Sequence, residues 1–275
     1  MSAKTLAFAN QKGGVGKTTS CINVAASLAF LGYRVLLVDL DPQGNATMGS
    51  GIDKHAPAVT VNDVLQKQAT LSEAVIRKTP AGFALLPANS DLTAAEVTLL
   101  NQENPAFILK TALEPELTHF DFIFFDCPPS LNMLTLNALT AAQAVLIPMQ
   151  CEYYALEGLS DLMATISEIK KTLNPNLEIG GVLGTMYDAR NRLAEEVLSQ
   201  LRLHFGDKLY RTLIPRNVRL AEAPSHGLPA LLYDASSKGA ESYLALAREM
   251  VGQAPKVAEQ RLSSRRQKRV DTVTA

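Results

Sequence analysis

The sequence contains no tryptophan, and only three cysteines and four histidines occur among its 275 residues. The cysteines, Cys21, Cys127 and Cys151, form no C-x-x-C pair and no spacing typical of a metal site, so we expect reduced thiols. No apolar stretch approaches the roughly 18 residues that a membrane-spanning helix requires. No charged segment followed by an apolar core opens the chain, so we expect no secretory signal. These absences argue against a protein stabilised by disulfides or by a bound metal, and against a membrane-spanning protein.

Charge is unevenly distributed along the chain, although the net charge is only −1. Beyond position 252 the chain has six basic and two acidic residues, so this tail carries +4 and residues 1–252 carry −5. The tail has no aromatic residue and little apolar periodicity, which is typical of disorder. The whole chain is 47% hydrophobic. We therefore predict one large α/β domain over residues 1–252, followed by a basic, disordered tail over residues 253–275.

A glycine-rich segment near the N-terminus, Asn10–Thr19, carries the strongest signal in the chain. An apolar run typical of a buried strand precedes it at 5–9, and a pattern typical of a packed helix follows at 20–31. Strand, glycine-rich turn, Gly-Lys-Thr and helix together define a phosphate-binding loop, in which backbone N–H groups point at phosphate oxygens. We expect Lys17 to reach the β- and γ-phosphates and the Thr18 hydroxyl to bind Mg²⁺.

The spacing of this loop departs from the common G-x-x-x-x-G-K-[ST] pattern. Five positions before Gly16 stands Gln11 instead of glycine, and an additional lysine, Lys12, follows it. From the residues alone, Lys12 is either a second phosphate ligand or a solvated surface charge.

Two acidic residues follow the next predicted strand, an apolar run over 33–39. Pro42 and Gly44 force a turn there, so Asp39 and Asp41 should lie at the carboxyl edge of the sheet, where α/β folds bind ligands. One carboxylate is expected near Mg²⁺ and the other near an attacking water. The alternative is that both serve only the turn or a helix cap.

A second strong signal is the run of large apolar residues over 120–126, which ends in Asp126. This pattern is typical of a Walker B strand, whose terminal acid is held beside the Mg²⁺ shell. The Pro-Pro-Ser sequence at 128–130 should end the strand and begin a loop that responds to the γ-phosphate.

The remaining pattern alternates strands and helices, which predicts a doubly wound, mostly parallel sheet with helices on both faces. We expect further strands at 83–87, 144–148, 179–185 and 208–215, short helices at 61–65 and 71–75, and longer helices at 91–100, 105–117, 159–173, 191–205 and 239–251. Asp91 is expected to cap its helix, and Leu193 to lie on the apolar side of the helix at 191–205.

Four segments resemble the motifs of one protein family. Residues 12–19 resemble the deviant Walker A motif of the ParA/MinD ATPase superfamily. Residues 38–47, 126–130 and 214–224 are similar to those of its chromosomal ParA/Soj subgroup, which partitions replicated DNA with a ParB partner. The resemblance covers residues 4–251. Two departures are small: Cys127 stands where the subgroup often has alanine, and His226 where an aromatic residue is common.

The resemblance implies a homodimer that sandwiches two ATP molecules between its subunits. Lys17 would contact the ATP of its own subunit, and Lys12 would reach the nucleotide of the opposite subunit. Glu152 would contact nucleotide across the same interface. The residues implied to bind nucleotide through the loop are Lys12, Gly13, Gly14, Val15, Gly16, Lys17, Thr18 and Thr19.

The resemblance also assigns the chemistry. Asp41 would position the hydrolytic water and contact Mg²⁺ through water, as a catalytic residue beside Lys12 and Lys17. Thr18 would bind the metal directly, and Asp126 would hold its water shell. Pro215 and Asn217 would line the adenine pocket.

DNA binding in this subgroup is nonspecific and depends on the ATP dimer, which requires cations facing phosphates. The candidates are Arg190, Arg192, Arg216 and Arg219. The resemblance further implies a slow ATPase that a ParB-type partner stimulates, in a cytoplasmic protein associated with the nucleoid.

Two rival activities share this loop. A membrane-associated division-site ATPase of the MinD type needs a C-terminal amphipathic helix, whereas this tail has almost no apolar anchors. An iron–sulfur reductase needs paired interface cysteines, which Cys127 and Cys151 do not match. We therefore expect DNA and not a membrane as the binding surface.

Overall fold

The computed structural model describes residues 2–152 and 157–252. The predicted basic tail over 253–275 lies outside these residues, so its disorder stays a prediction.

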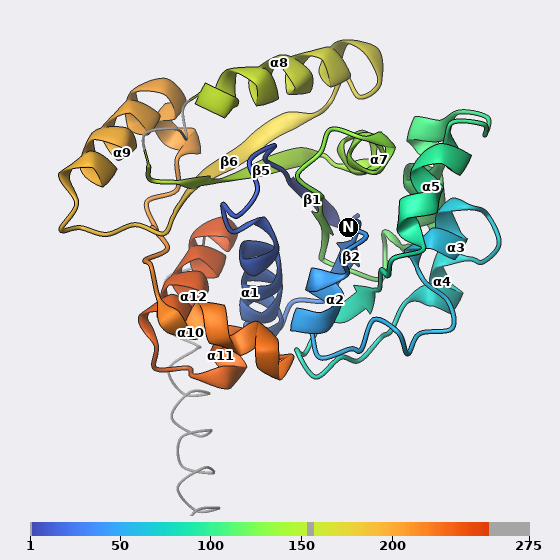
Figure 1. Ribbon diagram of the computed structural model, residues 1–275, viewed down its shortest axis with the longest axis horizontal. Helices are drawn as coiled ribbons and strands as arrows, with labels where there is room; N and C mark the ends of the chain where they lie inside the picture. The colour runs from blue at the N-terminus through green and yellow to red at the C-terminus, as the bar shows by residue number, and fades with distance from the viewer. Residues whose placement is uncertain (1, 153–156, 253–275) are drawn as a thin grey trace, which may run out of the picture.

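A six-stranded sheet forms the centre of the molecule, and every strand pair in it is parallel (Figure 1). The strand order is β3-β2-β4-β1-β5-β6. The bounds are β1 Lys4–Phe8, β2 Val35–Asp39, β3 Ala84–Leu86, β4 Phe122–Asp126, β5 Ala144–Gln150 and β6 Glu178–Thr185. In β2 and β4 every residue is buried, as continuous apolar runs in a parallel sheet require. Asp39 and Asp126, the last residues of these neighbouring strands, are register partners.

Helices cover both faces of this sheet, which confirms the doubly wound prediction. α1 and α12 pack on one face, while α7 and α8 pack on the other (Figure 1). Alternate residues of β4 serve the two cores, because strand side chains alternate between faces: Phe122 and Phe124 join the first, Ile123 and Phe125 the second. The helices are α1 Lys17–Phe30, α2 Asn45–Gly49, α3 Val61–Leu65, α4 Leu71–Ala74, α5 Leu92–Leu99, η1 Pro105–Phe107, α6 Ile108–Leu113, η2 Glu114–Glu116, α7 Met133–Ala141, α8 Glu157–Thr172, α9 Arg192–Phe205, η4 Gly206–Lys208, α10 Val218–Glu222, η5 Ala223–His226, α11 Ala230–Tyr233 and α12 Lys238–Val251.

The strand predicted at 208–215 is wrong. Within the described residues, this segment forms no continuous ladder with β6 and the chain after it: it has isolated bridges at Leu209 and Pro215 and a hydrogen bond from the Ile214 N–H to the Gly184 carbonyl at 2.9 Å. Between the bridges, the backbone N–H groups of Arg211 and Thr212 donate to the Glu249 carboxylate on α12, at 2.8 and 3.0 Å. The backbone N–H groups that would continue a strand ladder are therefore bound to α12 instead.

Two smaller expectations about helices also fail. Asp91 occupies the cap position of α5, but its side chain accepts no capping bond and accepts a hydrogen bond from the Asn89 amide instead. Leu193 is 38% exposed, because the buried side of α9 begins at the next residue, Ala194, and continues through Val197 and Leu198.

The Glu249 contact gives a stability prediction. We expect Glu249→Gln to lower the free energy of unfolding by about 1–3 kcal/mol, because an amide accepts only one of the two N–H bonds and loses the charge. Urea denaturation measures the change. As a control, Glu196→Gln changes an exposed α9 side chain that makes no hydrogen bond or ion pair to the described residues, and should shift stability by less than about 0.5 kcal/mol. Equal effects of the two substitutions would contradict the role given to Glu249.

Candidate nucleotide-binding site

The loop between β1 and α1 takes the shape that the glycine pattern predicts. Gly14 and Gly16 have φ of 75° and 88°, a left-handed conformation that a side chain would strain. Gly16 immediately precedes α1, whose N-terminus has no side-chain cap and no acidic residue in its first turn. The first N–H groups of α1 therefore remain available to an anion, and the helix dipole favours one there.

Hydrogen bonds with two other strands, β6 and β5, hold this loop in place. The Thr185 hydroxyl, at the end of β6, donates to the Val15 carbonyl at 2.8 Å. The Asn10 side chain accepts from the Lys12 N–H at 3.0 Å and donates to the Pro148 carbonyl of β5 at 2.8 Å. The loop is thus fixed before any ligand enters, which lowers the cost of binding one.

The two lysines of the loop lie in different environments. The Lys17 side chain is nearly buried, with 7% exposure, and its ammonium donates to the Lys12 carbonyl at 3.2 Å. Burial lowers the pKa of Lys17, and the nearby Asp126 and Asp41 counter that effect. Lys12 is partly exposed, and its ammonium makes no hydrogen bond or ion pair with the part of the chain that the structure describes. One cation therefore faces into the loop while the other is unpaired at its edge.

Asp126 ends β4 as a fully buried carboxylate. Neither of its oxygens has a hydrogen-bond partner among the described residues. Burial raises the pKa of Asp126 well above its ordinary value, and the charge of Asp39 adds to this increase. The nearby Thr18 hydroxyl acts to lower the pKa, although it does not make a hydrogen bond to Asp126. An unpaired buried carboxylate is costly unless donors reach it. The water shell of a cation held by Thr18 supplies such donors, so these residues fit Mg²⁺.

The two acids after β2 have different roles. Asp39 is fully buried and accepts three hydrogen bonds, from the Asp41 N–H at 3.1 Å and from the N–H and hydroxyl of Thr47 at 2.8 and 2.7 Å. Burial raises the pKa of Asp39 to about 6 although the Thr47 bonds act to lower it. The turn-forming interpretation therefore holds for Asp39. Among the described residues, the Asp41 side chain accepts only the Gln43 N–H, at 2.9 Å, and Asp41 is partly exposed.

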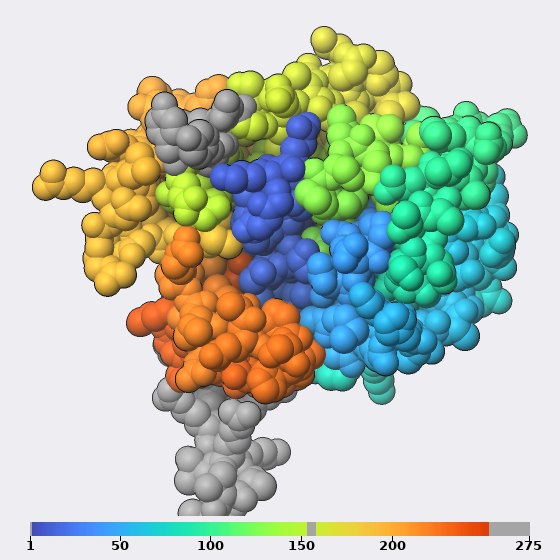
Figure 2. Space-filling view, in the orientation of Figure 1, coloured from blue at the N-terminus to red at the C-terminus, as the bar shows by residue number. Residues whose placement is uncertain are grey.

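A pocket of about 210 Å³ lies beside the helical end of the loop. Figure 2 shows the dark-blue N-terminal segment and the orange C-terminal segment meeting on one face. Pro215 and Asn217 both line this pocket, and the Asn217 side chain accepts the Arg219 N–H to begin α10. The lining is Gly16, Thr19, Thr185, Met186, Ile214, Pro215, Arg216, Asn217, Leu220, Ala221 and Tyr243.

Six of the lining residues were not predicted as site residues, and two of them, Thr185 and Met186, adjoin the end of β6. Thr185 ends β6 at the carboxyl edge, so the rule that ligands bind at that edge was a usable signal for it. Met186 has φ of 51°, a strained conformation for a residue with a side chain. No pattern in the sequence indicates that strain.

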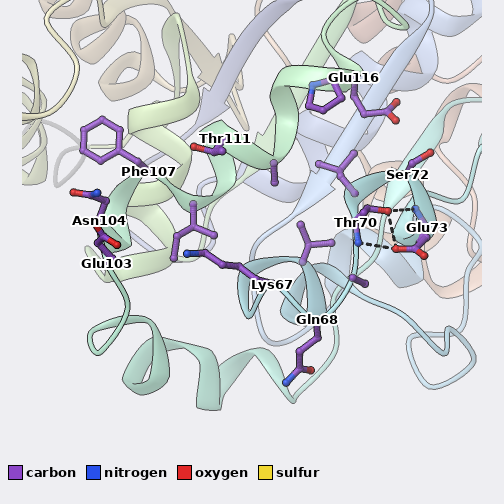
Figure 3. Close-up of a pocket in the computed structure, with 16 residues that line it drawn as sticks. Lys67, Gln68, Thr70, Ser72, Glu73, Glu103, Asn104, Phe107, Thr111 and Glu116 are labelled. Carbon is purple, nitrogen blue, oxygen red and sulfur yellow. Dashed lines mark hydrogen bonds between the residues drawn. The ribbon is translucent and has the colours of Figure 1, made fainter.

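A larger hollow, of about 820 Å³, lies away from the loop, between the α3–α4 segment and η1–α6 (Figure 3). Its right-hand wall in the figure is fixed by the capping box of α4, in which Thr70 and Glu73 exchange hydrogen bonds. None of the predicted site residues lines it. The phosphate loop and the unpaired Asp126, and not pocket size, therefore identify the candidate site.

Most of the predicted interface residues are engaged in ion pairs. Arg216 lies 3.3 Å from Glu152, which also accepts a hydrogen bond from Gln150. Arg190 binds Asp188 through two nitrogens at 2.9 and 2.8 Å, which lowers the pKa of Asp188 to about 2.

The other two predicted arginines differ from each other. Arg219 pairs with Glu222 at 2.8 Å and Asp234 at 3.3 Å. Arg192, the first residue of α9, makes no side-chain hydrogen bond or ion pair to residues 2–152 and 157–252. Three of the four predicted arginines are therefore in ion pairs within the described part of the chain, and Arg192 is not.

Comparison with known proteins identifies the family. A family model described as AAA domain matches residues 3–179. The chromosome partitioning protein ParA of Caulobacter vibrioides is 50% identical over 90% of this chain and 94% of its own length. The sporulation initiation inhibitor protein Soj of Bacillus subtilis is 51% identical over 90% of this chain and 98% of its own.

Among solved structures, a cobyrinic acid a,c-diamide synthase from Mycobacterium smegmatis, with bound ATP analog and magnesium, superposes with a TM-score of 0.80. It is 39% identical and the match covers 90% of this chain and 94% of that one. The phosphate loop, the buried acid that ends β4 and the two relatives at half identity agree. The chain belongs to the ParA/Soj family of chromosome-partitioning ATPases, within the ParA/MinD superfamily.

Proposed function

We propose that this chain partitions DNA as a slow, ATP-switched dimer. The observation that carries the proposal is the pair of lysines on one loop, with Lys17 buried inside it and the Lys12 ammonium at its edge without a partner among the described residues. A single-subunit NTPase needs only the first. A second, outward cation is suited to the nucleotide of another subunit.

Within one subunit, each residue has a defined task. The loop N–H groups and Lys17 bind the β- and γ-phosphates of ATP. Thr18 and Asp126 hold Mg²⁺, which when bound neutralises charge on the phosphate oxygens. Asp41, with one oxygen not used by its own turn, orients the attacking water. Pro215 and Asn217 line the adenine pocket.

Between subunits, ATP itself joins the two halves. Lys12 binds the nucleotide of the neighbour, and Glu152, which now pairs with Arg216, contacts that nucleotide from the same interface. The closed dimer then presents Arg190, Arg192, Arg216 and Arg219 to DNA phosphates. Arg192 is available at once, whereas the others must exchange a carboxylate for a phosphate.

Hydrolysis opens the dimer and releases DNA. The site has one carboxylate for the water and no evident stronger base, so basal turnover is slow. A ParB-type partner accelerates it by completing or tightening the site. The relatives named for chromosome partitioning support this cycle. The cytoplasmic, nucleoid-associated location follows from the DNA partner.

The rival is a MinD-like ATPase that binds membrane. Within the described residues, no helix has the length and apolar character to cross a bilayer. The amphipathic segment that peripheral binding needs would fall in the tail, outside those residues.

DNA binding tests the switch and the surface together. We expect the protein to co-sediment with nonspecific DNA in ATP but not in ADP or without nucleotide. Raising salt from 50 to 200 mM should weaken binding by at least about tenfold, because phosphate contacts release counterions. Anionic liposomes form the parallel arm and should not retain the protein. Equal DNA binding in ADP and ATP, or ATP-dependent binding to liposomes alone, would overturn the proposal.

A further inference from the structure

The loop between β4 and α7, residues 127–132, directly follows Asp126. Its tip, at 129–131, is exposed, and two prolines leave it few backbone donors. Inside the loop, the Thr135 hydroxyl of α7 donates to the Ser130 carbonyl at 2.7 Å. The loop continues directly from Asp126, whose carboxylate has no hydrogen-bond partner among the described residues, so a shift of the loop acts on the chain next to that carboxylate.

Asn132 connects the end of this loop to a different helix. Its side-chain oxygen caps α7 by accepting the Thr135 N–H at 3.0 Å. Its side-chain amide donates to the Glu96 carboxylate on α5. Figure 1 shows α5 beside α7, and Asn132 makes no other side-chain hydrogen bond to the described residues. One residue thus both starts α7 and ties the loop to α5.

α7 itself is held by a separate contact. The buried Asn137 side chain donates to the Pro105 carbonyl at 2.8 Å and accepts the Leu109 N–H at 3.1 Å. Breaking the Asn132–Glu96 bond therefore leaves α7 and its Thr135–Ser130 contact in place and releases the end of the loop from α5.

We propose that Asn132 is a positioning residue for ATP turnover, acting through its hydrogen bond to Glu96. The inference rests on the proposed ATPase function. The bond holds the 127–132 loop against α5, so that the region around Asp126 keeps the arrangement that hydrolysis needs. A substitution in α5 can therefore alter the rate of ATP turnover without a direct contact to the nucleotide.

A substitution that keeps the cap on α7 but disrupts the bond to Glu96 separates the positioning role of Asn132 from its capping role. Asn132→Asp keeps an oxygen for the Thr135 N–H, since aspartate is a good N-cap, but sets a carboxylate against Glu96. We expect kcat for ATP, measured in the steady state, to fall by about tenfold, the size of one charge-assisted hydrogen bond. KM should stay within about twofold, because the loop that binds the phosphates is not changed.

The double variant Asn132→Asp with Glu96→Gln restores a hydrogen bond of opposite direction, from glutamine to aspartate. We expect it to recover kcat to within about threefold of the original protein. Asn101→Asp is the matched control: it adds the same charge just beyond α5, at an exposed position, and should leave kcat unchanged.

The outcomes are distinct. Normal kcat in Asn132→Asp, or no recovery in the double variant, would refute the positioning role. A drop in both kcat and melting temperature that the double variant does not reverse assigns Asn132 to stability alone. Absence of ATPase activity in the unsubstituted protein would contradict the proposed function instead.

Discussion

Replacing Lys17 by alanine should raise the Kd for ATP by about a hundredfold or more. The Lys17 ammonium is the nearly buried cation of the loop, and its charge-assisted bonds to phosphate are each worth about 1.5–3 kcal/mol. Isothermal titration with ATP and Mg²⁺ measures the loss. Because the proposed cycle makes dimer closure depend on ATP, we expect DNA co-sedimentation in ATP to disappear in the same variant.

The control for this substitution is Lys171→Ala, which removes an exposed lysine from the last turn of α8. It should change neither ATP affinity nor DNA binding. Circular dichroism establishes that Lys17→Ala is folded, as we expect, because the substitution removes a charge that burial disfavours. Retained ATP-dependent DNA binding in a folded Lys17→Ala protein would show that the loop does not bind nucleotide as described.

Asp41→Ala should separate binding from turnover. We expect kcat to fall by at least about a hundredfold, the usual contribution of a group that orients or activates the nucleophile. Affinity for ATP and ATP-dependent DNA binding should persist, since Lys17, the loop and the pocket remain. Phosphate release measures turnover, and co-sedimentation measures the DNA-bound state.

Asp53→Ala provides the matched control for Asp41. Each of these acids accepts the N–H of the residue two positions later, Asp41 from Gln43 at 2.9 Å and Asp53 from His55 at 3.0 Å. Alanine therefore removes the same kind of turn bond in both variants. Turnover should be lost only in Asp41→Ala; hydrolysis at the original rate in that variant refutes its assignment.

Much of the sheet and the phosphate loop was predictable because their signals are local. Continuous apolar runs marked β2 and β4, and the glycines marked the turn before α1. The strand expected at 208–215 failed because Glu249, which binds its N–H groups, lies 37 and 38 residues further along the chain. The helix cap expected from Asp91 is absent because its carboxylate accepts a hydrogen bond from the neighbouring Asn89 amide instead.

The site was predictable in part for the same reason. Asp126 and Lys17 belong to motifs, whereas the division of labour between Asp39 and Asp41 depends on Thr47, which only the folded turn brings to Asp39. The ion pairs of Arg190, Arg216 and Arg219 also required coordinates, because a sequence does not specify which exposed charges pair.

Asp39 and Asp126 end adjacent parallel strands as register partners, and both are buried. Both carboxyls have a raised pKa, so each favours the folded chain more when protonated than when ionised. For Asp39 this contribution is complete below about pH 3.8 and is lost as the pH rises through about 6. At neutral pH the sheet therefore carries an electrostatic strain at the edge where its ligand binds. A substitution that relieves this strain should therefore stabilise the folded protein and, in the proposed site, lower the affinity for a cation.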